Sequence, residues 1–348
     1  MSDREQFVSI NGTDSDTLTI SCGVPQGSVL GPLLFLIFIN DLPNATDFLT
    51  LLFADNTTFQ WSDTNLESLY TKANIELEKA SEWFKSNKLT LNVSKTKFMI
   101  FSDKKLTVND VQLKIGNTSI EQVGSDCKTK YFKFVGHMID DSLSWEGHIE
   151  HIAKKLASSN FALNSTKNFL PLKQRLTLYY SLFDSHLNYG NLLWGCGKAP
   201  NLKKVFNLQK KCVRNVAQKS FKAHTDPIFK SLEILKLDDK LSYCRAIFMH
   251  KYRYGKLPES FNGIFSDIMS TEELQTRNNW YNYVNKPAVK KCLENYPYKK
   301  IVTNWNSLNI ELKATGEMEE FESLLKSNFL SQYSLETDCP ANCYSCAN

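Results

Sequence analysis

Hydrophobic and polar positions alternate most clearly around residues 49–61. Residues 49–53 are mostly apolar, Asp55-Asn56-Thr57 has the composition of a turn, and residues 58–61 alternate as a returning strand does. We expect residues 49–53 to form a buried strand that ends in an acidic turn. Such a turn holds the Asp55 carboxylate rigidly at the surface, which is how a metal ligand is best presented.

Similar patterns predict three more strand pairs and a series of helices. The strand pairs are expected at 7–10 with 17–20 across Asn11-Gly12, at 88–93 with 98–101, and at 111–115 with 118–123 across Gly116-Asn117. Apolar residues at three- and four-residue steps predict the clearest helix over 66–84, with cap chemistry at 62–65. From Trp145 onward the pattern is helical, with amphipathic helices at 174–187, 202–217 and 241–254. Together these elements predict an α+β fold.

The length and composition are those of a globular protein of two or three modules. The chain has 348 residues, of which 42% are hydrophobic and 22% charged, which argues against wholesale disorder. The longest apolar run, residues 29–39, is broken by Gly31-Pro32 and predicts a buried helix, not a membrane span. The polar first residues lack a signal-peptide core, and the nine cysteines are scattered. We therefore expect an intracellular protein of the nucleus or cytoplasm, with reduced thiols and no membrane contact.

Charge is distributed unevenly along the chain. Residues 1–100 hold 7 Lys and Arg against 12 Asp and Glu, whereas the remainder holds 34 against 25. A basic second part is compatible with nucleic-acid binding, although most such excesses are solvated faces. If its basic residues share one side, the helix at 202–217 would suit a phosphate backbone; they are Lys203, Lys204, Lys210, Lys211 and Arg214.

Several polar residues have both a chemical and a structural interpretation. The loop at 23–32 is stiff and close-packing, with Gln26 at its tip; its residue types alone favour a tight loop that starts a helix. His148 and His151 could share a metal, but no third ligand is evident, and His137 is expected to be packed in its strand. Three C-terminal thiols, at Cys339, Cys343 and Cys346, lack a fourth ligand, so we expect a flexible tail there.

The loop at 23–32 and the hairpin Phe53-Ala54-Asp55-Asn56, in that order and at that separation, resemble the palm of a reverse transcriptase. Within that class the chain is similar to the jockey-like polymerases of non-LTR retrotransposons, and the resemblance continues to about residue 335. It implies a right-hand polymerase architecture in four parts. These are a partial palm at 1–140, a helical thumb at 141–255, a C-terminal extension at 256–335 and a disordered tail at 336–348.

The resemblance implies RNA-directed DNA synthesis from deoxynucleoside triphosphates with Mg²⁺, on an RNA template and a DNA primer. It makes Asp55 the catalytic metal ligand. Pro25, Gln26 and Gly27 match the segment that contacts the template and nucleotide. Lys95 would lie near the triphosphate, as would Lys97, although two solvated turn lysines are an equal alternative. Residues Phe134, Val135 and Gly136 match the primer grip.

Two departures from the family pattern bear on activity. Asn56 stands where the family has a second aspartate, and no acidic residue before Gly23 lies in an apolar strand like the one that bears the first metal aspartate. On this interpretation the chain begins inside the palm, after that strand and after the fingers. We expect it to be inactive or nearly so by itself, with apolar strand edges exposed and poor solubility. The alternatives are a non-enzymatic RNA- or DNA-binding remnant and a decaying copy without function.

Overall fold

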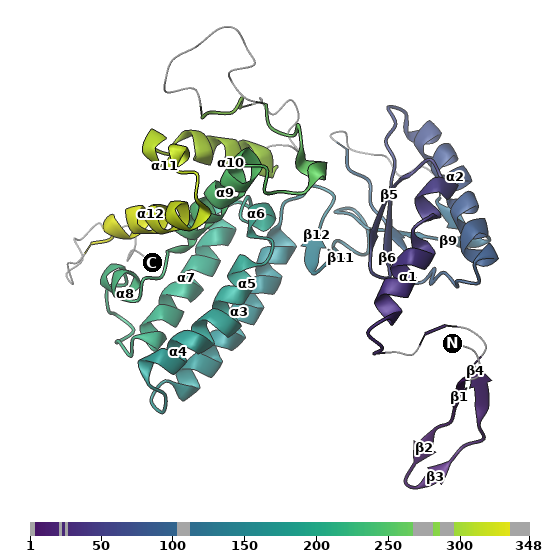
Figure 1. Ribbon diagram of the computed structural model, residues 1–348, viewed down its shortest axis with the longest axis horizontal. Helices are drawn as coiled ribbons and strands as arrows, with labels where there is room; N and C mark the ends of the chain where they lie inside the picture. Colours follow the sequence, from purple (N-terminus) through teal and green to yellow (C-terminus); the bar gives the residue numbers. More distant parts are fainter. Residues whose placement is uncertain are drawn as a thin grey trace. The chain divides into compact units, whose positions relative to one another are not determined.

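The computed structural model describes residues 4–20, 23–24, 27–102, 112–266, 281–285 and 296–334. The chain forms two compact units (Figure 1). The first comprises residues 1–98 and 107–121, and the second comprises residues 99–106 and 122–348. Both helices and strands are present, as the α+β prediction requires.

The first unit starts with two short antiparallel pairs. Strand β2 (Ser9–Ile10) pairs with β3 (Thr13–Asp14) across Asn11 and Gly12, whose φ angles of 54° and 80° are the left-handed values that this turn requires. The turn was predicted, but the pairing of 7–10 with 17–20 is wrong. Strand β4 (Leu18–Ile20) instead pairs with β1 (Arg4–Gln6), because β3 already occupies the edge of β2.

The apolar runs at 29–39 and 49–53 form the expected elements but are not buried. Helix α1 (Gly31–Ile39) buries only Gly31 and Ile39, and it is followed by the 3₁₀-helix η1 (Leu42–Ala45). Strand β5 (Leu49–Phe53) pairs with β6 (Asn56–Gln60), and Leu49, Leu51 and Phe53 are 62%, 46% and 61% exposed. The prediction of a buried helix and a buried strand is therefore wrong. Among the described residues no other strand joins this hairpin, and nothing covers these side chains.

Helix α2 (Leu66–Ser86) confirms the helix predicted at 66–84. The Asn65 side chain accepts hydrogen bonds from the backbone N–H groups of Glu67 and Ser68, which caps the helix. The buried side of α2 includes Ala73 and Leu77, which pack in a small core with Phe48 and Ile120. A second small core joins the end of α2 to α1 and η1 through Ile39, Leu42 and Phe84.

The last part of the first unit has less strand than predicted. Residues 89–92 are irregular, because the Asn92 carbonyl accepts hydrogen bonds from the N–H groups of Lys95 and Thr96 and turns the chain. Strand β7 (Lys97–Phe98) pairs with β10 (Glu121–Gln122). The pair across Gly116-Asn117 is confirmed as β8 (Lys114–Ile115) and β9 (Thr118–Ser119).

The second unit is a short hairpin followed by packed helices. The hairpin pairs β11 (Phe132–Phe134) with β12 (His137–Ile139). The helices are α3 (Glu146–Thr166), α4 (Leu172–Leu178), the π-helix η2 (Tyr179–Asp184), α5 (Ser185–Asn188), α6 (Asn191–Trp194), α7 (Ala199–Val216), α8 (Asp226–Ser231), α9 (Leu237–Arg253), the 3₁₀-helix η3 (Glu259–Phe261), α10 (Pro297–Asn306), α11 (Ile310–Ala314) and α12 (Met318–Ser331). All the helices predicted here are present, with the one at 174–187 built from α4, η2 and α5.

Two hydrophobic cores hold these helices together. The larger joins α3, η2, α7 and α8 through fully buried side chains such as Leu156, Phe183 and Phe229. The smaller joins α9, α10 and α12 around Met249, Trp305 and Phe321. The second unit therefore buries large side chains completely, as the helical periodicity of its sequence predicts.

Candidate functional site

Asp55 lies at the tip of the β5–β6 hairpin. Ala54 and Asp55 connect the strands, and Phe53 opposite Asn56 is the last pair of the ladder. Ala54 has a φ of 51°, which a residue with a Cβ adopts at a cost of about 1–2 kcal/mol. The short connection holds Asp55 and Asn56 side by side, and both are exposed. The hairpin therefore presents one carboxylate and one neutral amide to solvent.

These donors do not fit a site for two divalent ions. Two-ion nucleotidyl transfer places acidic oxygens around metals roughly 3.5–4 Å apart. Asn56 offers a carbonyl oxygen without charge, and the described part of the chain contains no group of three His, Cys, Asp or Glu side chains that could hold a metal. Asp55 remains the one carboxylate that the hairpin supplies, which is too little negative charge for a pair of divalent cations.

Of the residues expected to contact nucleotide or template, Pro25 and Gln26 lie outside the described residues. Gly27 is exposed, with a φ of 80° and no atom within 4 Å of where a Cβ would stand. Its backbone conformation, rather than a lack of space, therefore favours glycine.

Lys95 and Lys97 differ in their surroundings. Lys95 is exposed in a turn where its backbone N–H donates to the Asn92 side chain. The Lys97 ammonium instead forms an ion pair with Glu121 on the neighbouring strand. Of the two lysines, Lys95 is therefore the one whose side chain is available to an anionic ligand.

The segment predicted as the primer grip is the turn of the β11–β12 hairpin. Val135 and Gly136 form the turn, with φ angles of 42° and 80°. The Tyr189 hydroxyl donates a hydrogen bond of 2.8 Å to the Val135 carbonyl, and the Tyr189 ring stacks on His137 at 4.9 Å. The segment between α5 and α6 thus fixes the conformation of this turn.

His137 and His148 are buried side by side, with ring centroids 4.8 Å apart. The His148 Nδ1 accepts a hydrogen bond from the Met138 N–H, and burial lowers the pKa of His148 to about 4. Burial also lowers the pKa of His137. Both rings are thus neutral at pH 7, which confirms the prediction that His137 packs. The described residues supply no three-ligand group to support a metal shared by His148 and His151.

Gly190, at the N-terminus of α6, faces this histidine pair. Its φ is 62°, and a Cβ built there would stand 1.8 Å from the His137 Nε2. Such a distance is a steric overlap, so position 190 must lack a side chain while His137 keeps its place.

The basic residues of α7 share one side of the helix, which meets the condition for a surface that suits a phosphate backbone. At 100° per residue they lie within an arc of about 120°. Lys203, Lys204 and Lys211 are exposed. Lys210 is buried with its ammonium 5.2 Å above the Phe206 ring, and the Arg214 Nε donates to the Ala223 carbonyl. Three of the five cations are therefore exposed on this side.

The candidate residues divide between the two units. Gly27, Asp55, Asn56 and Lys95 belong to the first unit, and no hydrogen bond or ion pair among the described residues links them. Phe134, Val135 and Gly136 belong to the second unit. Sequence reasoning missed the role of Tyr189 in holding Val135. It also missed a cationic cavity at Arg245 and Lys300, for which the adjacent lysines at 299 and 300 were the available signal.

Residues 3–139 match the model of a known family. The family described as reverse transcriptase (RNA-dependent DNA polymerase) matches this segment. No solved structure matches the chain significantly. None of the helices in the described ranges is long and apolar enough to cross a membrane.

Curated relatives extend the similarity into the second unit. The RNA-directed DNA polymerase from mobile element jockey of Drosophila melanogaster is 26% identical over 263 residues, which is 72% of this chain and 28% of the relative. Its counterpart from Drosophila funebris is 25% identical over 249 residues, or 68% of this chain and 26% of the relative. A probable RNA-directed DNA polymerase from transposon X-element of Drosophila melanogaster is 24% identical over 247 residues, which is 69% of this chain and 26% of the relative. The chain thus spans little more than a quarter of the length of these relatives.

Proposed function

Residues 3–139 belong to the reverse transcriptase family, and from that premise we propose that the chain is part of an RNA-directed DNA polymerase that is inactive by itself. The domain derives from a non-LTR retrotransposon, as its relatives indicate. In this proposal residues 1–140 are a partial palm, 141–255 a thumb and 256–335 an extension. The partners are an RNA template, a DNA primer and deoxynucleoside triphosphates, in the nucleus or cytoplasm.

The proposed roles follow the geometry of the two hairpins. Asp55 is the carboxylate at the strained tip of β5–β6, where a metal ligand is held rigidly. Lys95 and Gly27, with Pro25 and Gln26, belong to the nucleotide and template side. Phe134, Val135 and Gly136 form the primer grip, and the hydrogen bond from Tyr189 supports a fixed turn there. Mg²⁺ is the ion that the family chemistry implies.

The observation that carries the proposed inactivity is the pair Asp55 and Asn56 at the hairpin tip. An amide cannot supply the negative charge that organises a second cation, and losing one charge-stabilising group commonly lowers a rate by ~10²–10³. The residues before the 23–32 loop also offer no carboxylate within an apolar strand. Both departures remove negative charge that would hold divalent ions, so both are expected to lower the rate of nucleotide transfer.

Primer extension on a poly(A) template tests this proposal. The full chain and its Asp55→Ala variant are compared, first with Mg²⁺ and then with Mn²⁺, and we expect no extension from either. Extension that vanishes in Asp55→Ala would overturn the inactivity and mean that another carboxylate, such as Asp41, completes the site. Extension that survives in Asp55→Ala would overturn the role of Asp55.

A non-enzymatic role in nucleic-acid binding is the second candidate, and the exposed side of α7 favours it. Lys203, Lys204 and Lys211 present three positive charges without a base-reading group among them. Binding of an RNA–DNA duplex should weaken with salt, and replacing the three lysines with glutamine should reduce the logarithmic salt slope by about 1 for each phosphate that these lysines neutralise. Lys85→Gln, an exposed lysine near the end of α2, is the matched control. A duplex that does not bind would leave the third interpretation, a decaying copy.

A further inference from the structure

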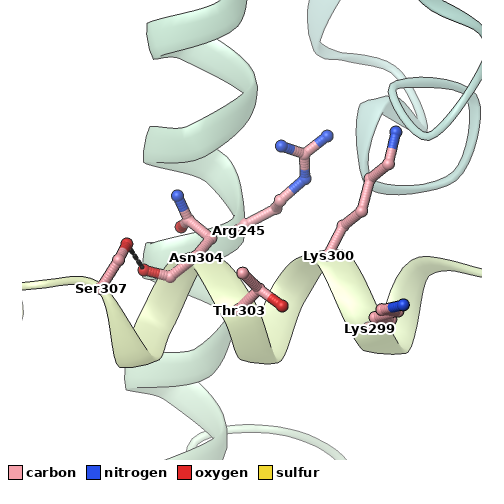
Figure 2. A pocket seen from close by; sticks show the side chains of 6 residues that line it. All are labelled: Arg245, Lys299, Lys300, Thr303, Asn304 and Ser307. Atoms are coloured by element: carbon pink, nitrogen blue, oxygen red, sulfur yellow. Dashed lines mark hydrogen bonds between the residues drawn. The ribbon is translucent and has the colours of Figure 1, made fainter. Parts of the chain in front are cut away.

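A cavity of about 530 Å³ lies between α9 and α10 in the second unit (Figure 2). Six side chains line it, one from α9, four from α10 and one from the residue that follows α10: Arg245, Lys299, Lys300, Thr303, Asn304 and Ser307. The four from α10 and Ser307 at its C-terminal cap follow helical three- and four-residue spacing and so form one stripe along the helix. Three of the six are cations, and none is acidic or aromatic. We call this site the α9–α10 cavity.

Its two inner cations are tied to successive peptide carbonyls. The Arg245 Nη2 donates to the Gly195 carbonyl at 2.9 Å, and the Lys300 Nζ donates to the Cys196 carbonyl at 3.0 Å. Figure 2 shows the two side chains extending to the same side from different helices. Because both carbonyls are neutral, these bonds orient the two cations without forming an ion pair.

Buried polar atoms at the cavity also lack partners. Arg245 is 9% exposed, and neither its Nε nor the Asn304 Oδ1 has a hydrogen-bond partner in the described part of the chain. An unpaired buried donor on a cation is costly, typically ~1–3 kcal/mol or more. The Arg245 Nε is itself enclosed, so a ligand entering from solvent would meet the exposed Lys299 and the partly exposed Lys300 side chains, with the buried Arg245 charge beside them.

The electrostatics of the cavity favour an anion. Among the described residues, Arg245, Lys299 and Lys300 form no ion pair. Burial lowers the pKa of Lys300, and the charge of Arg245 lowers it further, whereas Cys196 and Asp238 act in the opposite direction. A bound anion would relieve the repulsion between the two cations and stabilise both charged forms.

We propose that the α9–α10 cavity is a phosphate-binding site and that a polynucleotide strand supplies the phosphate. Arginine and lysine are the usual charged ligands of phosphate, and the Thr303 hydroxyl and the Asn304 amide are neutral donors of the kind found at nucleic-acid backbones. The Ser307 hydroxyl already donates to the Asn304 carbonyl. The stripe from Lys299 to Ser307 covers about 12 Å at 1.5 Å per residue, which exceeds the reach of a single phosphate. No aromatic side chain in the lining could stack on the base of a free nucleotide.

This site lies outside residues 3–139, and it neither uses a metal nor requires polymerization. It is also separate from the exposed lysines of α7, which belong to another helix. A failed phosphate-binding test would therefore overturn this site and leave the proposed polymerase origin intact. In the same way, a failure of the polymerase proposal would leave this site intact.

The first test measures binding to the full chain without divalent metal, using inorganic phosphate, tripolyphosphate and a short oligothymidylate in separate calorimetric titrations. The double variant Lys299→Gln/Lys300→Gln should lose at least about tenfold in affinity for each phosphate probe, because charged hydrogen bonds are removed. Lys85→Gln removes an exposed lysine of the first unit and should leave these affinities unchanged. Equal losses in the control, or no binding of any probe, would overturn the site.

The second test places a carboxylate in the cavity. Thr303 is exposed on α10, where glutamate is a good helix former, so Thr303→Glu should fold. We expect this variant to melt at a higher temperature than the parent without phosphate, and to lose the rise in melting temperature that phosphate gives the parent. A parent whose melting temperature responds equally to phosphate and to chloride at matched ionic strength would overturn the proposal.

The three probes distinguish the sources of phosphate. If oligothymidylate binds more tightly than inorganic phosphate, and the double variant binds it more weakly, the phosphate comes from a polynucleotide strand. If the double variant binds inorganic phosphate and tripolyphosphate more weakly but binds oligothymidylate with unchanged affinity, the cavity binds free phosphate. That result would overturn the polynucleotide part of the proposal.

Discussion

The two units of this chain bury their apolar side chains to different extents. In the second unit Leu163, Phe183, Trp194 and Trp305 have no solvent exposure, and they come from helices far apart in the sequence. In the first unit only small clusters form around α2, while α1 and β5 expose most of their large apolar side chains. The segment with the most recognisable family motifs is therefore the less completely packed.

This difference shows that the residues of the family motifs are not the residues whose burial stabilises the chain. The Asp55 turn depends on the ladder of two strands and on little else within the described residues. Apolar burial contributes about 25 cal/mol per Å², so a hairpin with one exposed apolar face gains little from it. An isolated pair of strands is marginal in water, and a covering layer is normally needed.

The largest expected effect separates a buried leucine from an exposed one. Leu163→Ala in α3 removes a fully buried side chain and should lower the free energy of unfolding by about 2–5 kcal/mol. Leu51→Ala in β5 should change it by less than about 0.5 kcal/mol. Urea unfolding followed by circular dichroism measures both. A comparable loss for Leu51→Ala would show that β5 is covered in solution and would erase the difference between the units.

Acid should weaken the second unit before the first. The pKa of His148 is lowered by burial from 6.5 to about 4, so the unfolded chain binds more protons between these values and stability falls as the pH drops through this window. At about 1.4 kcal/mol per pH unit, His148 accounts for a loss of about 3 kcal/mol. All six histidines lie in the second unit. Urea midpoints measured from pH 7 downward should show this loss.

In the first unit, Glu76 is the buried titratable residue whose effect on acid stability can be compared with that of His148. Burial raises its pKa, but hydrogen bonds from Lys79 and the Asp47 backbone lower it by more, so the net pKa is below 4.5. The stability that this carboxylate confers is present above pH 4.5 and is lost as the pH falls further. If tyrosine and tryptophan fluorescence showed both units weakening together between pH 6.5 and 4.5, His148 would not be the cause.

The smallest expected effect on stability comes from the exposed side of α1. Ile37 is 66% exposed, so Ile37→Lys should change the free energy of unfolding by less than about 0.5 kcal/mol while reducing light scattering and the binding of hydrophobic dyes. Ile39→Lys, two residues along the same helix, is the matched contrast. Ile39 is buried, and a lysine there should unfold this part of the first unit. An Ile37→Lys variant that is as destabilised as Ile39→Lys would contradict the exposure of this face.

Local pattern was enough to predict most of the elements. The helix at 66–84, the hairpin at Asp55 and the helices of the second unit follow from apolar periodicity and cap or turn residues, and each is observed. The hairpin turns at Ala54 and Asp55, whereas Asn56 and Thr57, which were predicted in the turn, belong to β6. The strand expected at 88–93 is absent, because hydrogen bonds to Asn92 turn the chain there. The pairing of 17–20 was wrong, because the edge of β2 is taken by the adjacent β3.

Burial and the cationic cavity could not be predicted in the same way. The apolar pattern at 29–39 and 49–53 shows which residues avoid water, but it does not show whether another element covers them. Arg245 and Lys300 are more than fifty residues apart in the sequence, and only the packing of α9 on α10 brings them to one cavity. The roles proposed for Asp55, Lys95 and Phe134 rest on resemblance and stay predictions.

The close approach of Gly190 to His137 makes these two positions a coupled pair in any collection of related copies. A side chain at 190 overlaps the imidazole, so a sequence that replaces Gly190 must also carry a smaller or differently placed residue at 137. The effect of a change at position 190 on stability then depends on the residue at position 137. Replacing Gly190 alone should destabilise the fold, and a second replacement at His137 should remove that loss of stability. Because Tyr189 stacks on His137 and holds the Val135 carbonyl, sequence drift at 190 would also alter the turn between β11 and β12.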